Sequence, residues 1–193
     1  MKKIILIFAL VITSITSFGQ NYQLTNGAYD NKIVGQYAGV DASTLYVKSL
    51  ETLSDWSGSQ KQSKINIDVQ DKEQGLIVYK GSLYIGYYSV TKNFLVAVGW
   101  NIYADFTLKI KCKDGKAQVS CHVPTLTFDW SAKEYPATTT VTLGEIYPKY
   151  IHKSQYRKIK QASIEYAPKV PPMFDNIITN LANNLNKQAE DDF

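Results

Sequence analysis

The sequence predicts an α+β protein in which an antiparallel sheet of five or more strands carries two helices on one face. Apolar residues recur at helical spacing through residues 42–56, and again through residues 173–188. Between these segments, the apolar residues of the stretch 94–112 alternate with a period of two, which is typical of a half-buried strand. Strands gathered in the middle of the chain and helices at its two ends favour α+β over alternating βαβ units.

The N-terminus has the order of a secretory signal peptide. Lys2 and Lys3 precede an unbroken apolar run at residues 4–12, and Ser17 and Gly19 are small residues two positions apart. The apolar run is short for crossing ~30 Å of hydrocarbon, so we favour a signal peptide over a membrane anchor. We therefore expect cleavage after Gly19 and a soluble mature protein in the periplasm or outside the cell.

The charge of the chain gives no sign of a nucleic-acid partner. The full sequence has a formal net charge of +4, and removal of Lys2 and Lys3 lowers it to about +2. A near-neutral exported protein lacks the basic excess that nucleic-acid binding needs. We therefore expect no nucleic-acid partner.

The remaining chain is long enough for one domain with a hydrophobic core. Its composition, 45% apolar and 20% charged, excludes a disordered or collagen-like chain. We expect a signal peptide at residues 1–19, an extended segment at 20–29 and a single domain at 30–193.

The first elements are a short strand near residues 32–35 and a helix at about 42–56. Asp41 and Ser43 offer N-caps, whose oxygens accept the free N–H groups of the first turn. We expect the helix to end before Ser57. The residues predicted to face the core are Leu45, Tyr46, Leu50, Leu53 and Trp56, and those largely on the other side are Lys48, Glu51, Ser54 and Asp55.

A hairpin follows the helix. Ile65, Ile67 and Val69 alternate with polar residues, residues 71–75 form a polar turn ending in glycine, and residues 76–80 are apolar on both faces. The last pattern predicts an interior strand.

The stretch 94–112 is too long for one straight strand in a small domain, so we expect a break or strong bend near residues 99–103. Asp114-Gly115 then predicts a two-residue hairpin turn. In that register every inward pair is apolar: Cys112 with Ala117, Ile110 with Val119, Leu108 with Cys121, and Phe106 with Val123.

The same register separates the two cysteines. Cys112 and Cys121 share a face but lie four pairs apart, or ~13 Å at ~3.3 Å per residue. A disulfide tolerates a Cα separation below ~7 Å. We therefore expect two free, buried thiols.

The C-terminal third mixes clear and unclear patterns. A bulge or strand end at Pro124 would explain why the apolar parity changes afterwards, and residues 138–146 contain a possible further strand. The stretch 147–170 is basic and tyrosine-rich, and its role is left open. A helix at about 173–188 precedes an acidic tail; its apolar stripe is Phe174, Ile177, Ile178, Leu181 and Leu185.

No residues form a recognisable catalytic or metal-binding pattern. The two histidines are His122, on the polar face of a strand beside the opposite-facing Cys121, and His152. A nucleophile elbow and a glycine-rich phosphate loop are both missing from the sequence. We therefore expect no catalytic residue, metal or cofactor. Two carboxylates that lie close together could hydrolyse a glycoside. The acids considered for such a pair are Asp68, Asp71, Asp129 and Glu134, and we interpret them as solvated turn residues.

The 14 tyrosines are the main oddity of the composition. Exposed tyrosines could form a surface that binds glycan or protein, or tyrosine could simply suit strands and sheet edges. The two groups concerned are Tyr84, Tyr87 and Tyr88, and Tyr147, Tyr150, Tyr156 and Tyr166.

The order of these elements resembles a known family. The motifs are Leu45-Tyr46 with Trp56, Ile65-Asn66-Ile67, the turn 71–75 followed by Leu76-Ile77-Val78 and Gly81, the strand 106–110, and Lys113-Asp114-Gly115-Lys116. Residues 30–128 resemble domain-of-unknown-function family 4468, a group of exported bacterial proteins with a TATA-box-binding-protein-like (TBP-like) fold, and residues 129–193 would be an extension. The resemblance implies a curved antiparallel sheet with helices on one face and implies no catalytic residues. A TBP-like fold does not imply DNA binding.

These observations favour an exported, non-enzymatic binding or assembly module of the cell envelope, whose partner is an envelope protein or a glycan. The alternative is an envelope hydrolase acting on glycan or peptide. Convergence of an acid, histidine or cysteine pair in a cleft would favour the hydrolase. The sequence assigns neither the binding residues nor the oligomeric state.

The first prediction concerns the mature N-terminus. Signal peptidase should cut after Gly19, because small residues stand at the two positions that it reads. N-terminal sequencing or intact-mass measurement of the exported protein should therefore find Gln20 as the first residue. Mature material that keeps Met1 would contradict the export hypothesis.

Overall fold

The computed structural model describes residues 27–90, 98–130, 138–143 and 153–190, without the side chains of residues 153–156 and 186–190. The predicted signal peptide, the segment up to residue 26 and the acidic tail after residue 190 lie outside the described residues. Glu134, Tyr147, Tyr150 and His152 lie outside them as well.

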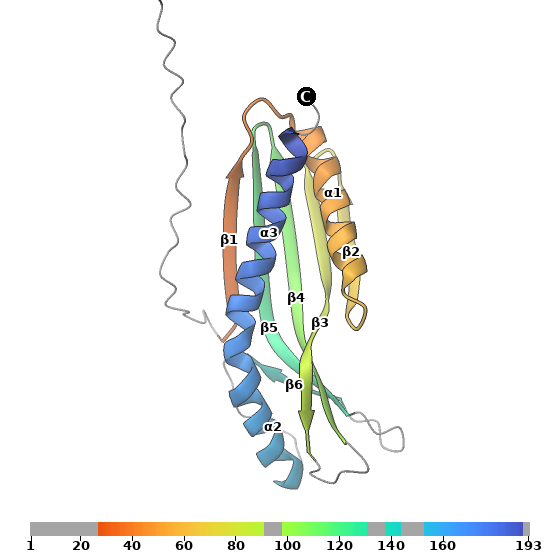
Figure 1. Ribbon diagram of the computed structural model, residues 1–193, viewed down its shortest axis with the longest axis vertical. Coiled ribbons are helices and arrows are strands. Elements are labelled where there is room, and N and C mark those ends of the chain that lie inside the picture. The colour runs from red at the N-terminus through yellow and green to blue at the C-terminus, as the bar shows by residue number, and fades with distance from the viewer. Residues whose placement is uncertain (1–26, 91–97, 131–137, 144–152, 191–193) are drawn as a thin grey trace, which may run out of the picture.

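The described chain forms an antiparallel sheet and a layer of helices (Figure 1). The strands run in the order β1-β5-β4-β3-β2, and β6 pairs with the far part of β5. This arrangement confirms the predicted α+β class. The elements are β1 (Tyr29–Gln36), α1 (Ala42–Ser59), β2 (Lys64–Asp71), β3 (Leu76–Ser89), β4 (Gly99–Lys113), β5 (Lys116–Trp130), β6 (Thr138–Thr142), α2 (Lys153–Tyr166), a 3-10 turn η1 (Ala167–Lys169) and α3 (Val170–Glu190).

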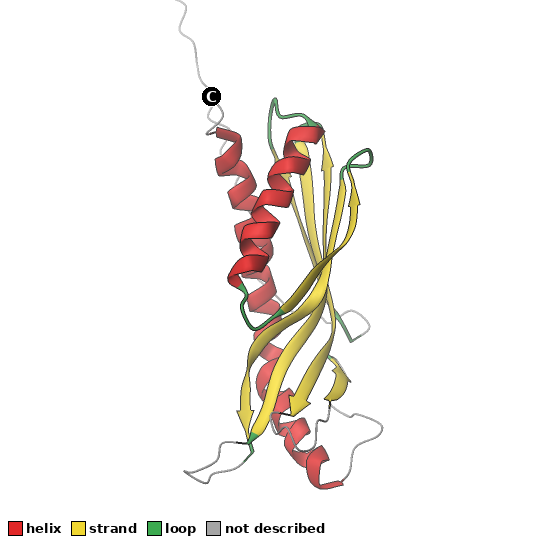
Figure 2. Ribbon diagram, turned by 90° about the vertical axis from the view of Figure 1, so that its right-hand side faces the viewer, coloured by secondary structure: helices red, strands yellow, loops and turns green. Residues whose placement is uncertain are grey.

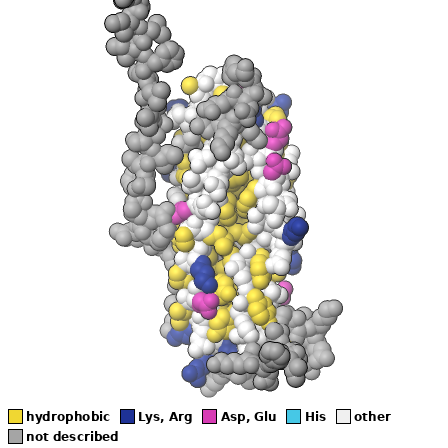
Figure 3. All heavy atoms as spheres, viewed as in Figure 1, with side chains coloured by type: hydrophobic (Ala, Val, Ile, Leu, Met, Phe, Trp, Pro, Cys, Tyr) yellow, Lys and Arg dark blue, Asp and Glu magenta, His cyan; other side chains and the backbone are white. Residues whose placement is uncertain are grey.

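The two predicted helices lie on one face of the sheet, as expected. Helix α1 contacts β3, β4 and β5, helix α3 contacts β1 and β5, and the two helices contact each other. Figures 1 and 2 show them side by side over the upper half of the sheet. Hydrophobic side chains gather between the helices on this face, and the charged side chains there are few (Figure 3).

The core is centred on aromatic contacts between the sheet and both helices. The ring of Phe106 in β4 lies 5.8 Å from that of Trp56 in α1 and 5.6 Å from that of Phe174 in α3, centroid to centroid. Aromatic pairs at such distances add to the burial of their apolar surface. One sheet residue therefore joins the two helices.

Helix α1 differs from its prediction in two details. It continues to Ser59, because the hydroxyls of Ser57 and Ser59 bond to the carbonyl oxygens of Ser54 and Trp56 and satisfy the last turn. Lys48, predicted on the outer side, is only 7% exposed. Because α1 packs against α3 as well as the sheet, its buried stripe is wider than one sheet contact requires. Its N-cap is Asp41, as expected, at 2.8 Å from the amide nitrogen of Thr44.

The first hairpin has the predicted turn but an exposed outer strand. Gly75 has a φ of 61°, and the Asp71 carboxylate accepts a hydrogen bond from the amide of Gln74 at 2.9 Å. β3 is interior, as predicted, while β2 is an edge strand. A register shift between Ile67 and Val69 moves Val69 to the face opposite the helices, where it is 37% exposed. Ile67 stays on the helix side but is 46% exposed, because β2 lies at the edge of the sheet.

The β4–β5 hairpin has the predicted register over its first part. Cys112 pairs with Ala117, Ile110 with Val119 and Leu108 with Cys121, and Gly115 in the turn has a φ of 68°.

The predicted pair of Phe106 and Val123 is replaced by a bulge. Between the pairs Thr107–His122 and Asp105–Thr125, β4 contributes one residue and β5 contributes two, Val123 and Pro124. The extra residue at Pro124 explains the change of apolar parity, as expected.

The expectation of a break or strong bend near residues 99–103 is met by no break within that range, and Gly99 is the first residue of the strand. β4 runs without interruption from Gly99 to Lys113. The register shifts lie in its neighbours instead, between Tyr84 and Gly86 of β3 and at Pro124 of β5. These bulges and the strong twist of the sheet (Figure 2) accommodate a strand of this length. Phe94 and Val96 lie outside the described residues.

The basic, tyrosine-rich stretch contains helix α2, which its sequence pattern does not predict. α2 packs on β3 where Gly86 leaves room: a Cβ at this glycine would lie 2.5 Å from the Tyr166 ring, whose hydroxyl donates to the carbonyl oxygen of Tyr87 at 3.0 Å. The prolines interrupt the helix only at η1. Pro171 and Pro172 sit in the first turn of α3, where the missing N–H groups cost little.

Both cysteines are free and buried, as predicted. Burial raises the pKa of the Cys112 and Cys121 thiols, and the nearby Asp30 and Asp175 raise that of Cys121 further. A protonated, enclosed thiol is a poor nucleophile. The two side chains therefore serve as small hydrophobic residues of the core.

The second prediction tests whether α3 belongs to the core. Leu181 is 2% exposed, so Leu181→Ala should leave a cavity and lower the free energy of unfolding by ~2–5 kcal/mol. Lys111→Ala, on the opposite sheet face, should change it by less than ~0.5 kcal/mol. Chemical denaturation of both variants measures the difference. If Leu181→Ala were as stable as the parent, α3 would not belong to the core.

The third prediction concerns thiol reactivity. In the native protein at mildly alkaline pH, both thiols should resist alkylation, because burial shields them and raises their pKa. After unfolding without a reductant, mass spectrometry should find both thiols labelled, with a reduced sample as control. An unlabelled pair bridged between residues 112 and 121 would refute the register.

Candidate functional site

The sheet face opposite the helices, which we call the outer face, collects most of the exposed polar side chains of the strands. Alternate side chains along each strand point to opposite faces of the sheet, so the polar ones gather on the face away from the helices. Two rows cross β1, β5, β4 and β3 in register: Asp30, His122, Thr107 and Lys80, and then Lys32, Ser120, Lys109 and Val78. No described helix covers these residues.

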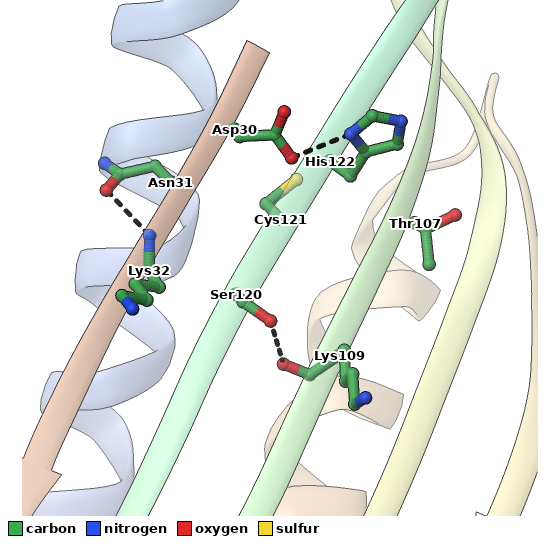
Figure 4. Close-up of a pocket in the computed structure, with 8 residues that line it drawn as sticks. All are labelled: Asp30, Asn31, Lys32, Thr107, Lys109, Ser120, Cys121 and His122. Atoms are coloured by element: carbon green, nitrogen blue, oxygen red, sulfur yellow. Dashed lines mark hydrogen bonds and ion pairs between the residues drawn. The ribbon is translucent and has the colours of Figure 1, made fainter. Parts of the chain in front are cut away.

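A shallow depression of about 500 Å³ lies on the outer face where β1, β5 and β4 run side by side. We call it the outer depression (Figure 4). Three neighbouring strands therefore supply cationic, hydroxyl and imidazole groups to one hollow. The residues that line it are Asp30, Asn31, Lys32, Thr107, Lys109, Ser120, Cys121 and His122.

A hydrogen bond connects two of the strands in the outer depression. His122 Nδ1 lies 2.7 Å from Asp30 Oδ1, and both side chains are about half exposed, at 48% and 49%. The pair forms because the β1–β5 register sets Asp30 directly beside His122.

The imidazole has no nucleophile within hydrogen-bonding reach among the described residues. The hydroxyl of Ser120 donates to the backbone carbonyl of Lys109 at 3.3 Å, and Cys121 faces the core. A hydrolase of the serine or cysteine type requires a hydroxyl or thiol bonded to the base. The described residues therefore provide an acid–histidine pair without its third member.

The depression carries unbalanced positive charge. The ammonium groups of Lys32 and Lys109 form no ion pair with a described carboxylate, whereas Lys80 beside them pairs with Asp68 at 2.8 Å. Asp30 is the one acid among the lining residues, and it is bonded to His122. The ammonium groups of these two lysines are therefore available to bind an anionic ligand.

The outer face continues past the bulge into a surface rich in hydroxyl groups. Asp105 lies at its centre and accepts hydrogen bonds from Ser82 at 2.6 Å, Thr125 at 2.8 Å and Thr127 at 2.7 Å. These three bonds satisfy most of the capacity of the carboxylate. Asp105 therefore fixes the neighbouring hydroxyls and is poorly placed to act as a free acid.

Tyrosines of β3 and β4 stand on the same surface. The rings of Tyr84 and Tyr103 meet edge to face with their centroids 5.6 Å apart, and both side chains are partly exposed. Burial raises the pKa of Tyr103, and Asp129 and Tyr84 add to this shift, so the phenol stays protonated at neutral pH. Tyr88 and Tyr166 lie on the helix side instead. Tyrosines therefore stand on both faces of the sheet, partly exposed on the outer face and packed against the helices on the other.

The described acids that the sequence offered as a catalytic carboxylate pair do not lie together. Asp68 pairs with Lys80, Asp71 accepts from the amide of Gln74, and Asp129 accepts from the hydroxyl of Thr138 at 3.2 Å. Within the described ranges, no three histidine, cysteine or acidic side chains lie close enough together to hold a metal ion.

Sequence reasoning missed Asp30, Lys32 and Asp105. The pairing of β1 with β5 is non-local, so nothing near Asp30 in the sequence points to His122. A signal for Asp105 was present: it stands on the polar parity of β4, between Tyr103 and Thr107.

Comparisons with known proteins identify the fold family. The family model described as "Domain of unknown function (DUF4468) with TBP-like fold" matches residues 29–124. This confirms the resemblance and the TBP-like fold that it implied. No curated protein matches the chain. None of the described helices has the length and apolar character needed to cross a membrane.

Two solved structures are similar to the chain. A DUF4468 family protein from Bacteroides ovatus ATCC 8483 has 14% identity and a TM-score of 0.49, with 85% of this chain and 90% of that chain covered. A TBP-like protein from Parabacteroides distasonis ATCC 8503 has 11% identity and a TM-score of 0.48, with 84% of this chain and 97% of that chain covered.

Proposed function

We propose that this chain, whose residues 29–124 belong to the DUF4468 family, is an exported, non-enzymatic binding module of the cell envelope that holds its ligand on the outer face. The observation that carries the proposal is the outer depression. It combines two lysines without described ion-pair partners, a half-exposed imidazole and two hydroxyl-bearing residues on a face that no described helix covers.

Several features support binding over catalysis. The Asp30–His122 pair has no hydroxyl or thiol bonded to it among the described residues, and the Asp105 carboxylate is held by three hydroxyl groups. A nucleophile needs an adjacent base. Among the described residues, none combines a free hydroxyl or thiol with the imidazole of His122, so the hydrolase alternative is the weaker one.

The order of residues at the N-terminus supports export. A basic start, an apolar run and small residues at the cut would deliver the mature chain to the periplasm or beyond. Envelope polymers and envelope proteins are then the partners within reach.

The fourth prediction is that the mature protein sediments with envelope fragments through its outer face. Purified residues 20–193 are mixed with washed envelope fragments of the bacterium that produces the protein, and the sedimented fraction is measured. Reversing both free charges with Lys32→Glu and Lys109→Glu should weaken binding about tenfold, because two attractive contacts become repulsive.

Lys61→Glu is the matched control. Lys61 is an exposed lysine in the α1–β2 connection, away from the outer depression, and its reversal should leave sedimentation unchanged. Circular dichroism checks that all variants are folded. Equal sedimentation of the parent and the Lys32→Glu, Lys109→Glu variant would remove the outer depression as the binding site. Release of soluble fragments from the envelope by the parent protein would favour the hydrolase.

A further inference from the structure

We propose that the ligand of the outer face is an acidic saccharide, whose carboxylate or phosphate lies between Lys32 and Lys109 and whose sugar rings extend toward Tyr103 and Tyr84. This inference rests on the proposed function and names the ligand class of the same site. Four observations lead to it, concerning the charge of the outer depression, its polar groups, the tyrosines along the same strand and the scarcity of apolar side chains.

The charge of the outer depression selects an anionic group. Lys32 and Lys109 project from strands on either side of β5, and the register places both beside Ser120. Neither ammonium group has a described carboxylate within ion-pair distance. A carboxylate or phosphate seated between them would receive charge-assisted hydrogen bonds from two sides.

The remaining lining groups suit a ligand with many hydroxyls. Thr107 and Ser120 offer hydroxyl groups beside the lysines, and the imidazole of His122 stands half exposed at the edge of the hollow. The depression is wide and shallow, with about 500 Å³ of space, so it can take a sugar ring together with its acidic substituent.

The tyrosines extend the site along β4. Tyr103 and Thr107 lie on the same face of this unbroken strand, four positions apart, or ~13 Å at ~3.3 Å per residue. The C–H face of a pyranose ring packs well against an aromatic ring, and the protonated phenol of Tyr103 can donate to a sugar hydroxyl. A short oligosaccharide can therefore reach from the lysines to the tyrosines.

The scarcity of apolar side chains disfavours a protein or a membrane as the ligand. Among the described residues, Val34 and Val69 are the large hydrophobic side chains exposed on the outer face. The core of a protein interface needs clustered apolar and aromatic anchors, and a membrane-bound surface needs side chains that enter the acyl region. Apart from the Tyr84–Tyr103 pair, the outer face offers ammonium and hydroxyl groups instead.

The fifth prediction is tested by calorimetric titration of the mature chain with defined probes. Trigalacturonic acid supplies a carboxylated saccharide, and a phosphorylated oligosaccharide of similar length supplies the phosphate arm. Maltotriose is the neutral saccharide, hexaglutamate is an acidic ligand without sugar, and inorganic phosphate is an anion alone. We expect at least one acidic saccharide to bind more tightly than maltotriose, hexaglutamate and phosphate.

Three variants separate the contributions. Lys32→Gln with Lys109→Gln should lower the affinity for the acidic saccharide about tenfold, whereas Lys61→Gln should leave it unchanged. Tyr103→Ala should weaken saccharide binding severalfold without changing the weak binding of phosphate. Tyr103→Phe keeps the ring and should retain most of the affinity, which guards against a folding defect in the alanine variant.

Each outcome is decisive. Hexaglutamate binding as tightly as the acidic saccharides would indicate an acidic protein as the partner, and maltotriose binding equally well would remove the acidic group from the proposal. If no saccharide binds but sedimentation with envelope fragments still depends on Lys32 and Lys109, the saccharide inference fails and the proposed function stands. Loss of that dependence as well would overturn both.

Discussion

The rest of the structure depends on the bulge at Pro124 and on the ring that it leaves facing the helices. Along β5 the buried residues occupy odd positions up to Val123 and even positions from Leu126, so a regular strand would turn one of the two sets to solvent. One extra residue at Pro124 keeps both sets inside, opposite Phe106. Phe106 can then contact α1 through Trp56 and α3 through Phe174. The bulge at Pro124 therefore determines both which residues of β5 are buried and where the two helices contact the sheet.

The same bulge divides the outer face into its two chemical parts. On the side of the hairpin turn, β5 pairs with β1, and the Asp30–His122 pair and the outer depression lie there. On the other side β5 pairs with β6, and Pro124 itself accepts a hydrogen bond from the amide of Leu143 at 2.8 Å. Asp105 stands beside the bulge and gathers hydroxyls from β3 and β5. The change of neighbouring strand therefore produces a cationic region next to a hydroxyl-rich one.

Local signals in the sequence determine how much of this could be predicted. Asp114-Gly115 fixes the β4–β5 register because the turn permits one pairing that places the apolar residues on one face. The apolar residues of α1 and α3 recur at helical spacing, which predicts both helices. Helix α2 was missed because its buried residues, among them Ile159 and Ala162, stand among lysines and other polar residues. The Asp30–His122 pair was missed because no hairpin joins β1 to β5. Local sequence patterns do not indicate which strands distant in the sequence become neighbours in the sheet.

The C-terminal extension also supports the candidate site, although it lies beyond the residues that match the family model. β1 is an edge strand, so it has hydrogen bonds to β5 alone among the strands. Its position also depends on the side chains that it directs toward the helices. The Tyr29 hydroxyl and the Asn31 amide both donate to the carboxylate of Asp175 in α3. Side chains alternate along a strand, so Asp30 and Lys32 point to the outer face. The bonds to Asp175 fix the backbone of β1 and therefore the position of these two side chains. Helix α3 thus positions one wall of the outer depression through β1, without contributing a residue to its lining.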